Sequence, residues 1–409
     1  MTMLTDESST SGKTTYLQYR YVIAALILIA NFSIGLNWYS IAPVLPLAIK
    51  SFNITAASAS LLVALPLLIK SAIGLPGSVV VARFGLRRIF TISWFLLGAL
   101  ALSWMAPNFL TLLLLRLSYG VGAAFMMPAL GTLVMQQFPP QERTVINSLN
   151  LVIMSLGITI SYAVAVPLAN LISWRGVLGL FGAFGLLGAV AWFFLGRTQS
   201  ATQEERIVFT VKDVREVLQN RTILLLLLGD SLVFTLYAAL SDWLPTYYYE
   251  VRGISLSQAS NITGLLSFVG ILAVVVGGYL TMKVKEKRLM FIIPGILVAL
   301  GGFGSFLVSN LAGIYVSVIL LGFGAWVYQP ILLTLPMELT WMTPNKIAIV
   351  WGASMTIAGF GMFVSPVLVG VSRDIFGSFL PGFIISAVPA LMLIFTGIFL
   401  PSNEIVKNI

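Results

Sequence analysis

Long apolar runs, separated by short polar stretches, recur along the whole chain. Each run approaches or exceeds the roughly 20 residues that an α-helix needs to cross a hydrocarbon layer about 30 Å thick. Six runs precede a polar stretch at 197–221 and six follow it. The pattern predicts membrane-spanning helices at about 20–47, 58–82, 89–106, 109–136, 144–169, 175–196, 222–246, 258–281, 289–308, 311–335, 345–369 and 380–400.

These runs divide the chain into predicted parts. The polar linker keeps Val211, Val214 and Leu218 at helical spacing among charges, which is typical of a short interfacial helix. The first 18 residues are polar and lack the apolar core of a signal peptide, so we expect a retained cytoplasmic tail. The predicted division is a tail at 1–18, a bundle at 19–196, the cytoplasmic linker at 197–221, a second bundle at 222–401 and a cytoplasmic tail at 402–409.

The two halves of the chain repeat one another. The segment GVGAAFMMP from Gly120 matches GFGAWVYQP from Gly322, so that two glycines, an alanine and a proline recur at one offset. A similar alignment places Asn31 opposite Asp230. The predicted fold class is therefore an all-α membrane protein with twelve transmembrane helices in two pseudo-symmetric six-helix bundles. Such a repeat predicts a site between the bundles at mid-membrane, reached alternately from each side.

The composition agrees with this class, because 58% of the 409 residues are apolar and only 9% are charged. The net charge of +9 reflects topology. With both termini in the cytoplasm, 17 of the 23 lysines and arginines fall in cytoplasmic segments, as the loop-charge rule requires. Two others, Lys70 and Arg116, fall inside predicted spans. We expect a multi-pass protein of the cell membrane that contacts lipid and binds no nucleic acid.

The residue types also limit the chemistry. The chain has no cysteine and no histidine, which excludes disulfides, thiolate chemistry, histidine metal sites and histidine proton relays. It has no nucleotide-binding glycine loop and no nucleophile–base pattern, so we expect neither an enzyme nor a cofactor or metal. Any proton that the protein carries must bind to a carboxylate.

Two charged residues near the middle of predicted spans are the sharpest candidates for a site. A lysine at the depth of Lys70 costs roughly 2.5–3.5 kcal/mol on insertion scales, so it should face a protein interior or a wet cavity. Its ammonium offers three donors to an anion, although an internal ion pair is the alternative. Asp230 is the candidate proton carrier, or else a permanent counter-ion of Lys70 or Arg116.

Other candidates follow from helical spacing and from loop charges. The predicted substrate contacts are Asn31, Trp38, Tyr237, Trp326, Gln329 and Trp351, although aromatic residues at this spacing more often only pack. The predicted gating residues are Arg83, Arg87, Arg88 and Glu338, with Glu338 a possible partner of Arg83 and solvated loop charge as the alternative. Asp242, beside Trp243 and three tyrosines, is interpreted as part of an interfacial aromatic belt.

Two motifs resemble the major facilitator superfamily. The segment RLSYGVGAA is similar to the family's Arg-x-x-x-Gly-x-Gly pattern, carried here by Arg116, Gly120 and Gly122. The segment PGSVVVARFGLRR resembles the family's loop signature, but Ser78 replaces a glycine and Ala82 replaces an aspartate. The resemblance implies alternating access and a role for Arg116 in coupling protonation to bundle movement. Arg116 keeps its charge and cannot carry the proton, and bonds to carbonyls of the first helix are the alternative.

Phrases such as NWYSIAPVLP and SDWLPTYYYEVRG are similar to prokaryotic members of the family that carry small anions, of the nitrate, cyanate and anion:cation symporter groups. The resemblance implies a monomeric secondary transporter that moves a small anion, in symport with protons. A single central cation favours a monovalent anion. A polyspecific proton-driven exporter of lipophilic compounds is the alternative, although the fifth helix lacks the exporters' glycine-proline signature. A membrane sensor or assembly factor fits the fold but not the buried charges.

Overall fold

A computed structural model describes residues 7–196 and 211–401 of the chain. Within these residues, twelve helical segments are long and apolar enough to span a membrane. The predicted twelve-helix all-α fold is confirmed. The predicted tails up to residue 6 and from residue 402, and the linker residues 197–210, lie outside the described residues.

The N-terminal bundle contains six spans, two of which include 3₁₀ segments. Its first helix begins at Glu7, well before the predicted start of the span, and two short elements follow it before the next long helix. The elements are α1 (Glu7–Trp38), η1 (Ala42–Val44), α2 (Leu45–Phe52), α3 (Ala56–Phe84), α4 (Leu86–Gly98), η2 (Ala99–Met105), α5 (Phe109–Gln137), α6 (Pro140–Ile172) and α7 (Trp174–Leu195).

The C-terminal bundle also contains six spans, and a short amphipathic helix precedes it. That helix buries Val217 against the bundle, while Glu216 forms an ion pair with Lys346. The elements are α8 (Val211–Gln219), α9 (Arg221–Glu250), α10 (Leu256–Lys283), α11 (Leu289–Leu307), α12 (Leu311–Val327), α13 (Gln329–Thr334), η3 (Leu335–Glu338), α14 (Pro344–Phe376), α15 (Leu380–Ala390) and α16 (Met392–Phe399).

Local chemistry fixes where these helices start and where one of them breaks. The Asn220 side chain accepts a hydrogen bond from the backbone N–H of Ile223, and so caps α9. The span at Leu311–Glu338 is interrupted at Tyr328, two residues before Pro330, because proline has no N–H to continue the helical ladder. This break positions two residues of the candidate site.

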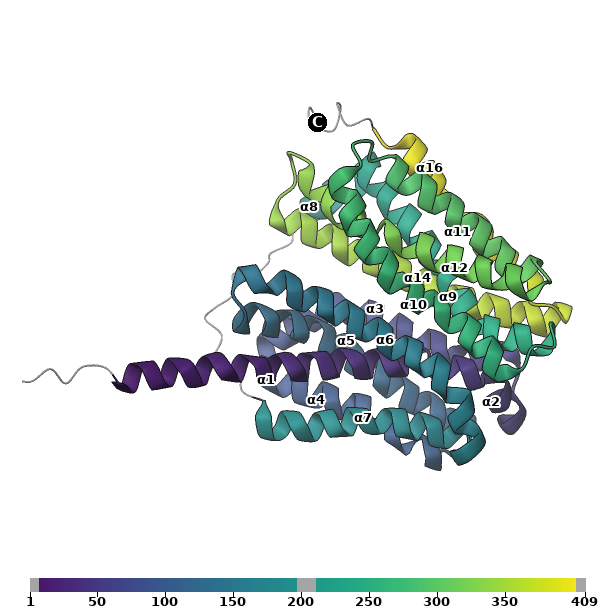
Figure 1. Cartoon of the computed structure of the whole chain (residues 1–409), viewed down its shortest axis with the longest axis horizontal. Helices are drawn as coiled ribbons and strands as arrows, with labels where there is room; N and C mark the ends of the chain where they lie inside the picture. The colour runs from purple at the N-terminus through teal and green to yellow at the C-terminus, as the bar shows by residue number, and fades with distance from the viewer. Residues whose placement is uncertain (1–6, 197–210, 402–409) are drawn as a thin grey trace, which may run out of the picture.

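The two bundles lie side by side and diverge toward the end where α8 lies (Figure 1). At the opposite end they are joined by hydrogen bonds, and we call this the closed end. There, the Tyr162 hydroxyl of α6 donates to the carbonyl of Ser241 in α9 at 2.6 Å. The carboxylate of Asp374 in α14 accepts from the backbone N–H groups of Ala56 and Ala57 in α3, at 2.9 and 2.8 Å.

The repeated glycines permit close packing of helices. A Cβ atom built on Gly120 would lie 2.8 Å from Cα of Pro66, and one built on Gly322 would lie 2.9 Å from the carbonyl oxygen of Leu266. Small residues of this kind let helix backbones approach in a membrane protein. The repeat therefore specifies packing at equivalent places in the two bundles.

Candidate functional site

Lys70 lies on α3 and places its ammonium over an aromatic ring of α1. The Nζ atom lies 3.4 Å from the centroid of the Trp38 ring, in a cation–π contact that contributes about 0.5–2 kcal/mol. Among the described residues, Lys70 has neither a carboxylate within ion-pair range nor a hydrogen-bond acceptor. The indole N–H of Trp38 is buried and also lacks an acceptor. The pair therefore offers N–H donors that no described group accepts from and a positive charge that no described carboxylate pairs with.

Asp230 lies on α9 inside a cage of neutral donors. Its Oδ1 accepts hydrogen bonds from the Tyr328 hydroxyl at 3.0 Å and the Gln329 amide at 2.7 Å, and its Oδ2 accepts one from Ser354 at 3.1 Å. The break between α12 and α13 brings Tyr328 and Gln329 to this carboxylate. Sequence reasoning identified Gln329 as a site candidate but did not predict that Tyr328 and Ser354 donate hydrogen bonds to Asp230.

The cage can accommodate both protonation states of the carboxyl. Gln329 uses its amide nitrogen here and can only donate to Asp230, whereas the hydroxyls of Tyr328 and Ser354 can donate or accept. A protonated Asp230 can therefore donate to one hydroxyl while it still accepts from Gln329. In the described part of the chain, no ion pair joins Asp230 to Lys70 or Arg116.

Three aromatic side chains pack together on the C-terminal bundle. The Trp326 ring centroid lies 5.3 Å from that of Phe234 and 6.1 Å from that of Tyr237. Gly270 makes room for the indole, because a Cβ built there would lie 2.7 Å from the Cδ1 atom of Trp326. The buried indole N–H of Trp326 has no acceptor among the described residues. This cluster provides an apolar surface and a free donor.

The remaining predicted substrate contacts are Asn31 and Trp351. The amide of Asn31 donates to the carbonyl of Ile27 in its own helix, at 3.0 Å. Trp351 is partly buried on α14, three residues before Ser354. Neither observation tests whether Asn31 and Trp351 bind substrate, so these roles stay predictions.

Arg116 is fully buried and binds the end of the first helix. Its guanidinium donates to the carbonyls of Asn37 at 2.7 Å, Trp38 at 3.0 Å and Leu62 at 2.7 Å, and to the Ser40 hydroxyl at 3.2 Å. The last carbonyls of a helix have no partner inside the helix, so this cation caps α1 and ties it to α3 and α5. The geometry fits the alternative interpretation of Arg116, in which it bonds to carbonyls of the first helix.

Asp242 lies at the closed end and is fully buried. Neither of its carboxylate oxygens has a hydrogen-bond donor among the described residues. It interacts electrostatically with Arg116, although the two do not form an ion pair within 4.0 Å. The belt interpretation is wrong for Asp242, Trp243 and the first two tyrosines of the segment, because all four are buried. It stays a prediction for Tyr249, which is 46% exposed. Helical spacing alone does not reveal that this face of α9 is covered by protein.

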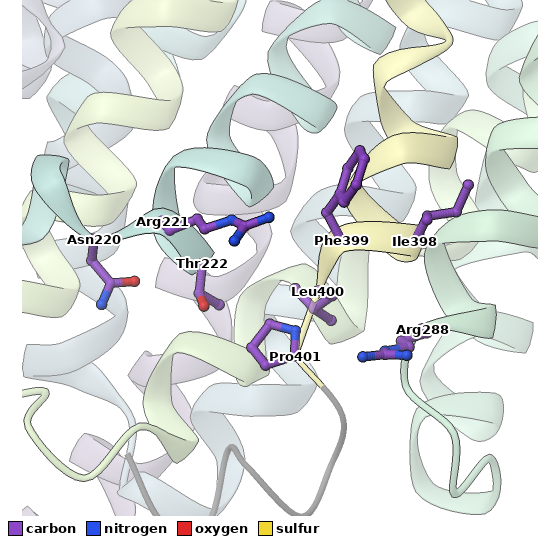
Figure 2. A pocket seen from close by; sticks show the side chains of 8 residues that line it. All are labelled: Asn220, Arg221, Thr222, Arg288, Ile398, Phe399, Leu400 and Pro401. Carbon is purple, nitrogen blue, oxygen red and sulfur yellow. The ribbon is translucent and has the colours of Figure 1, made fainter.

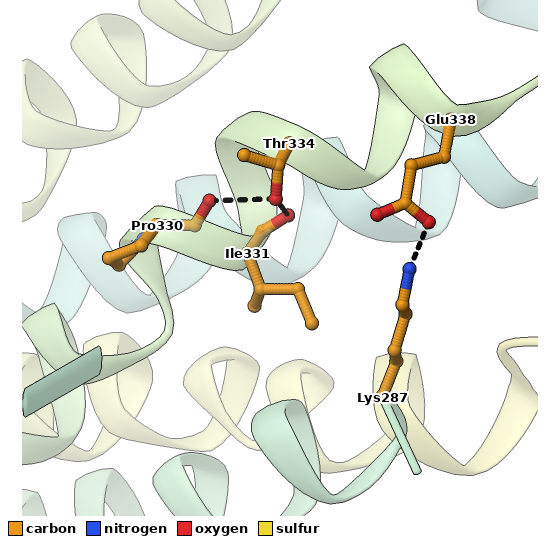
Figure 3. Close-up of polar contacts among 5 residues, drawn as sticks. All are labelled: Lys287, Pro330, Ile331, Thr334 and Glu338. Atoms are coloured by element: carbon orange, nitrogen blue, oxygen red, sulfur yellow. Dashed lines mark hydrogen bonds and ion pairs between the residues drawn. The ribbon is translucent and has the colours of Figure 1, made fainter. Parts of the chain in front are cut away.

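The predicted gating charges are not joined to one another in this conformation. Glu338 forms an ion pair with Lys287 of its own bundle (Figure 3), while Arg87 and Arg88 are exposed. Arg83 is also exposed and stacks on the ring of Phe84, at 5.7 Å from its centroid. The predicted pairing of Arg83 with Glu338 is therefore absent from the described contacts. The side chains of Ser78 and Ala82 lie outside the described part of the structure.

Twelve spans in two bundles, with charged groups held inside them, define a multi-pass membrane transporter. The chain belongs to the Major Facilitator Superfamily, whose family profile matches residues 27–366. It is therefore a secondary transporter and not an enzyme.

Individual relatives are distant from the chain. It is 25% identical over 335 residues to a hexuronate transporter of Bacillus subtilis, covering 76% of this chain and 78% of that protein. It is 32% identical over 130 residues to a probable nitrate/nitrite antiporter of Thermus thermophilus, covering 32% of this chain and 29% of that protein. A solved structure of a bacterial homologue of the human lysosomal transporter Spinster matches with a TM-score of 0.69 at 16% identity, covering 95% of this chain and 96% of that one. These similarities confirm the fold and the predicted resemblance to anion carriers.

Proposed function

We propose that this protein moves a small monovalent anion across the membrane by alternating access, in symport with protons. The observation that carries the proposal is the ammonium of Lys70, which rests on an indole ring and has no anionic partner in the described chain. A cation inside a membrane protein is costly unless it is paired, so a substrate that supplies the negative charge offsets that cost. The names of the two curated relatives, which carry a hexuronate and nitrate or nitrite, support an anionic substrate.

The unpaired donors in the two bundles favour an anion over a cation. Lys70 and the indoles of Trp38 and Trp326 have N–H groups without described acceptors. Of the two carboxylates buried in the described chain that a cationic substrate could use, Asp230 is occupied by three donors of its own bundle. The other, Asp242, lies at the closed end and interacts electrostatically with Arg116. An anion can accept from the free donors without displacing any hydrogen bond. In this proposal Asp230 carries the coupled proton.

The orientation follows from loop charge. The closed end carries few of the chain's basic residues, and the end that holds α8 carries most of them. By the positive-inside rule, we place the closed end outside the cell and both termini in the cytoplasm. The conformation described here is then the one that opens toward the cytoplasm.

Uptake into liposomes tests the role of Lys70. Purified protein is reconstituted with a pH gradient, acidic outside, and uptake of a radiolabelled hexuronate and of radiolabelled nitrate is measured. The Lys70→Ala variant should lose uptake of whichever anion the wild type carries. The matched control is Lys50→Ala, because Lys50 is exposed at the end of α2 and should leave uptake intact. Wild-type rates in Lys70→Ala would remove the basis for anion binding at this residue.

The role of Asp230 is tested by separating exchange from accumulation. Asp230→Asn retains the shape of the side chain but cannot carry a proton. We expect this variant to exchange labelled for unlabelled anion across the membrane, while a pH gradient no longer drives net accumulation. Accumulation at the wild-type level in Asp230→Asn would assign the proton to another group.

A polyspecific exporter of lipophilic compounds is the second candidate. The aromatic cluster of Phe234, Tyr237 and Trp326 is the observation that favours it, because such surfaces bind planar apolar molecules. Cells that express the chain would then tolerate lipophilic toxins better than cells that do not express it. Unchanged sensitivity together with anion uptake would reject the exporter.

A further inference from the structure

A pocket opens on the C-terminal bundle at the end where α8 lies. It has a volume of about 430 Å³ and is lined by the first residues of α9, the residue before α11 and the end of α16 (Figure 2). Its lining residues are Asn220, Arg221, Thr222, Arg288, Ile398, Phe399, Leu400 and Pro401. These are the positions at which three spans meet the membrane surface, so the pocket lies at the depth of lipid headgroups.

Two arginines give the pocket a positive charge. Arg221 and Arg288 line it (Figure 2), and neither has a carboxylate partner among the described residues. The Nε atom of Arg288 is buried and has no hydrogen-bond acceptor within residues 7–196 and 211–401. Arg221 lies over the Phe399 ring, 6.0 Å from its centroid. The N-termini of α9 and α11 both meet here, and helix N-termini favour negative charge.

On the side of α16 the pocket continues into an apolar surface. Ile398 and Phe399 are 48% and 52% exposed at its edge. Farther along the same three helices, Leu224, Ile293 and Phe395 are also exposed. A ligand that fills the pocket and this surface must therefore combine an anionic head with an apolar body. Free phosphate would satisfy only the arginines.

We propose that this pocket is a binding site for the phosphate of an anionic phospholipid, whose acyl chains lie along the exposed faces of α9, α11 and α16. A phosphodiester supplies the acceptor oxygens that Arg221 and Arg288 lack, and guanidinium groups bind phosphate oxygens in paired hydrogen bonds. Basic pockets between transmembrane helices on the cytoplasmic side are suited to such headgroups. The site is separate from Lys70 and Asp230 and does not depend on the substrate.

Native mass spectrometry of the whole protein in detergent tests the site. The protein is titrated with phosphatidylglycerol and, separately, with phosphatidylcholine, and the affinity of the first bound lipid is measured. The test variant is the double substitution Arg221→Gln/Arg288→Gln. The control is Lys212→Gln/Arg215→Gln, which removes the same charge from two exposed positions of α8 at the same end of the molecule.

The wild type and the control should bind phosphatidylglycerol more tightly than phosphatidylcholine. The test variant should lose about 30-fold in affinity for phosphatidylglycerol, which is about 2 kcal/mol for two cations at a membrane surface. Equal loss in the control, or no loss in the test variant, would overturn the site. A parallel arm measures protection from thermal unfolding by inorganic phosphate. Protection of the wild type by phosphate to the same degree as by lipid would overturn the lipid assignment in favour of a free anion.

Discussion

Replacing Asp374 should open the closed end of the molecule. The carboxylate of Asp374 in α14 accepts hydrogen bonds from the backbone N–H groups of Ala56 and Ala57 in the first turn of α3. These are among the N–H groups that a helix cannot satisfy internally. Because α14 and α3 belong to different bundles, this contact must break when the bundles separate at this end. Asp374→Ala removes it before any movement occurs.

The size of the effect follows from the geometry. A side chain that accepts a helix N-terminal N–H typically contributes about 1 kcal/mol, and up to about 2 kcal/mol in favourable cases. Asp374 makes two such bonds, but it lies at an exposed rim where water competes for them. We therefore expect a loss of about 1–2 kcal/mol, which changes the ratio of closed to open molecules by about 5–30-fold.

Spin labels can measure this ratio, because the chain has no cysteine of its own. Labels at Asn170→Cys and Val251→Cys lie on exposed positions, one on each bundle, at the closed end. Pulsed dipolar spectroscopy should show a longer distance gaining population in Asp374→Ala. The control is Arg373→Gln, which breaks an ion pair to Glu250 inside one bundle. An unchanged distance distribution in Asp374→Ala, or an equal change in the control, would refute the reasoning.

Three further outcomes concern stability in detergent, measured as melting temperature with wild-type protein as reference. Gly277→Ala should lower the melting temperature, because the new Cβ would lie 1.9 Å from the carbonyl oxygen of Val327 and overpacking costs about 1–3 kcal/mol. The control Gly278→Ala places its Cβ in open space and should leave the melting temperature unchanged. Equal effects of the two substitutions would contradict the packing argument. Arg116→Lys should also lower the melting temperature, since one ammonium cannot replace four hydrogen bonds from a planar guanidinium. An unchanged melting temperature would show that the helix cap is dispensable. Asp242→Asn should leave the melting temperature unchanged or raise it, because a buried carboxylate without a described donor costs more than its attraction to Arg116 beyond ion-pair range contributes. A clear fall would show that the charge of Asp242 stabilises the fold.

The parts of this molecule that depend on local pattern were predictable from sequence. Apolar runs specify the spans, since only helices of that length satisfy their own backbone in lipid. Lys70, Arg116 and Asp230 stood out because a charge inside such a run is rare. The sequence predicted one continuous span at 311–335, so neither the break at Tyr328 nor the hydrogen bond from Tyr328 to Asp230 was foreseen.

Contacts between distant segments were not predictable in the same way. The donors to Asp230 lie on other helices, about 100 or more residues away from it in the sequence. Asp374 meets Ala56 across 318 residues. The burial of Asp242 likewise depends on which face of α9 the other bundle covers. Such pairs follow from the packing of whole bundles, and no spacing in one sequence encodes them.

Four ion pairs among the described residues each lie within one half of the molecule. Arg20 pairs with Glu142 inside the first bundle, while Lys287, Lys346 and Arg373 pair with acids of the second bundle or of the helix docked on it. None of them crosses from one bundle to the other. A rocking movement therefore leaves these four ion pairs intact. Because salt weakens them equally in both conformations, they should make the balance between the conformations little dependent on ionic strength.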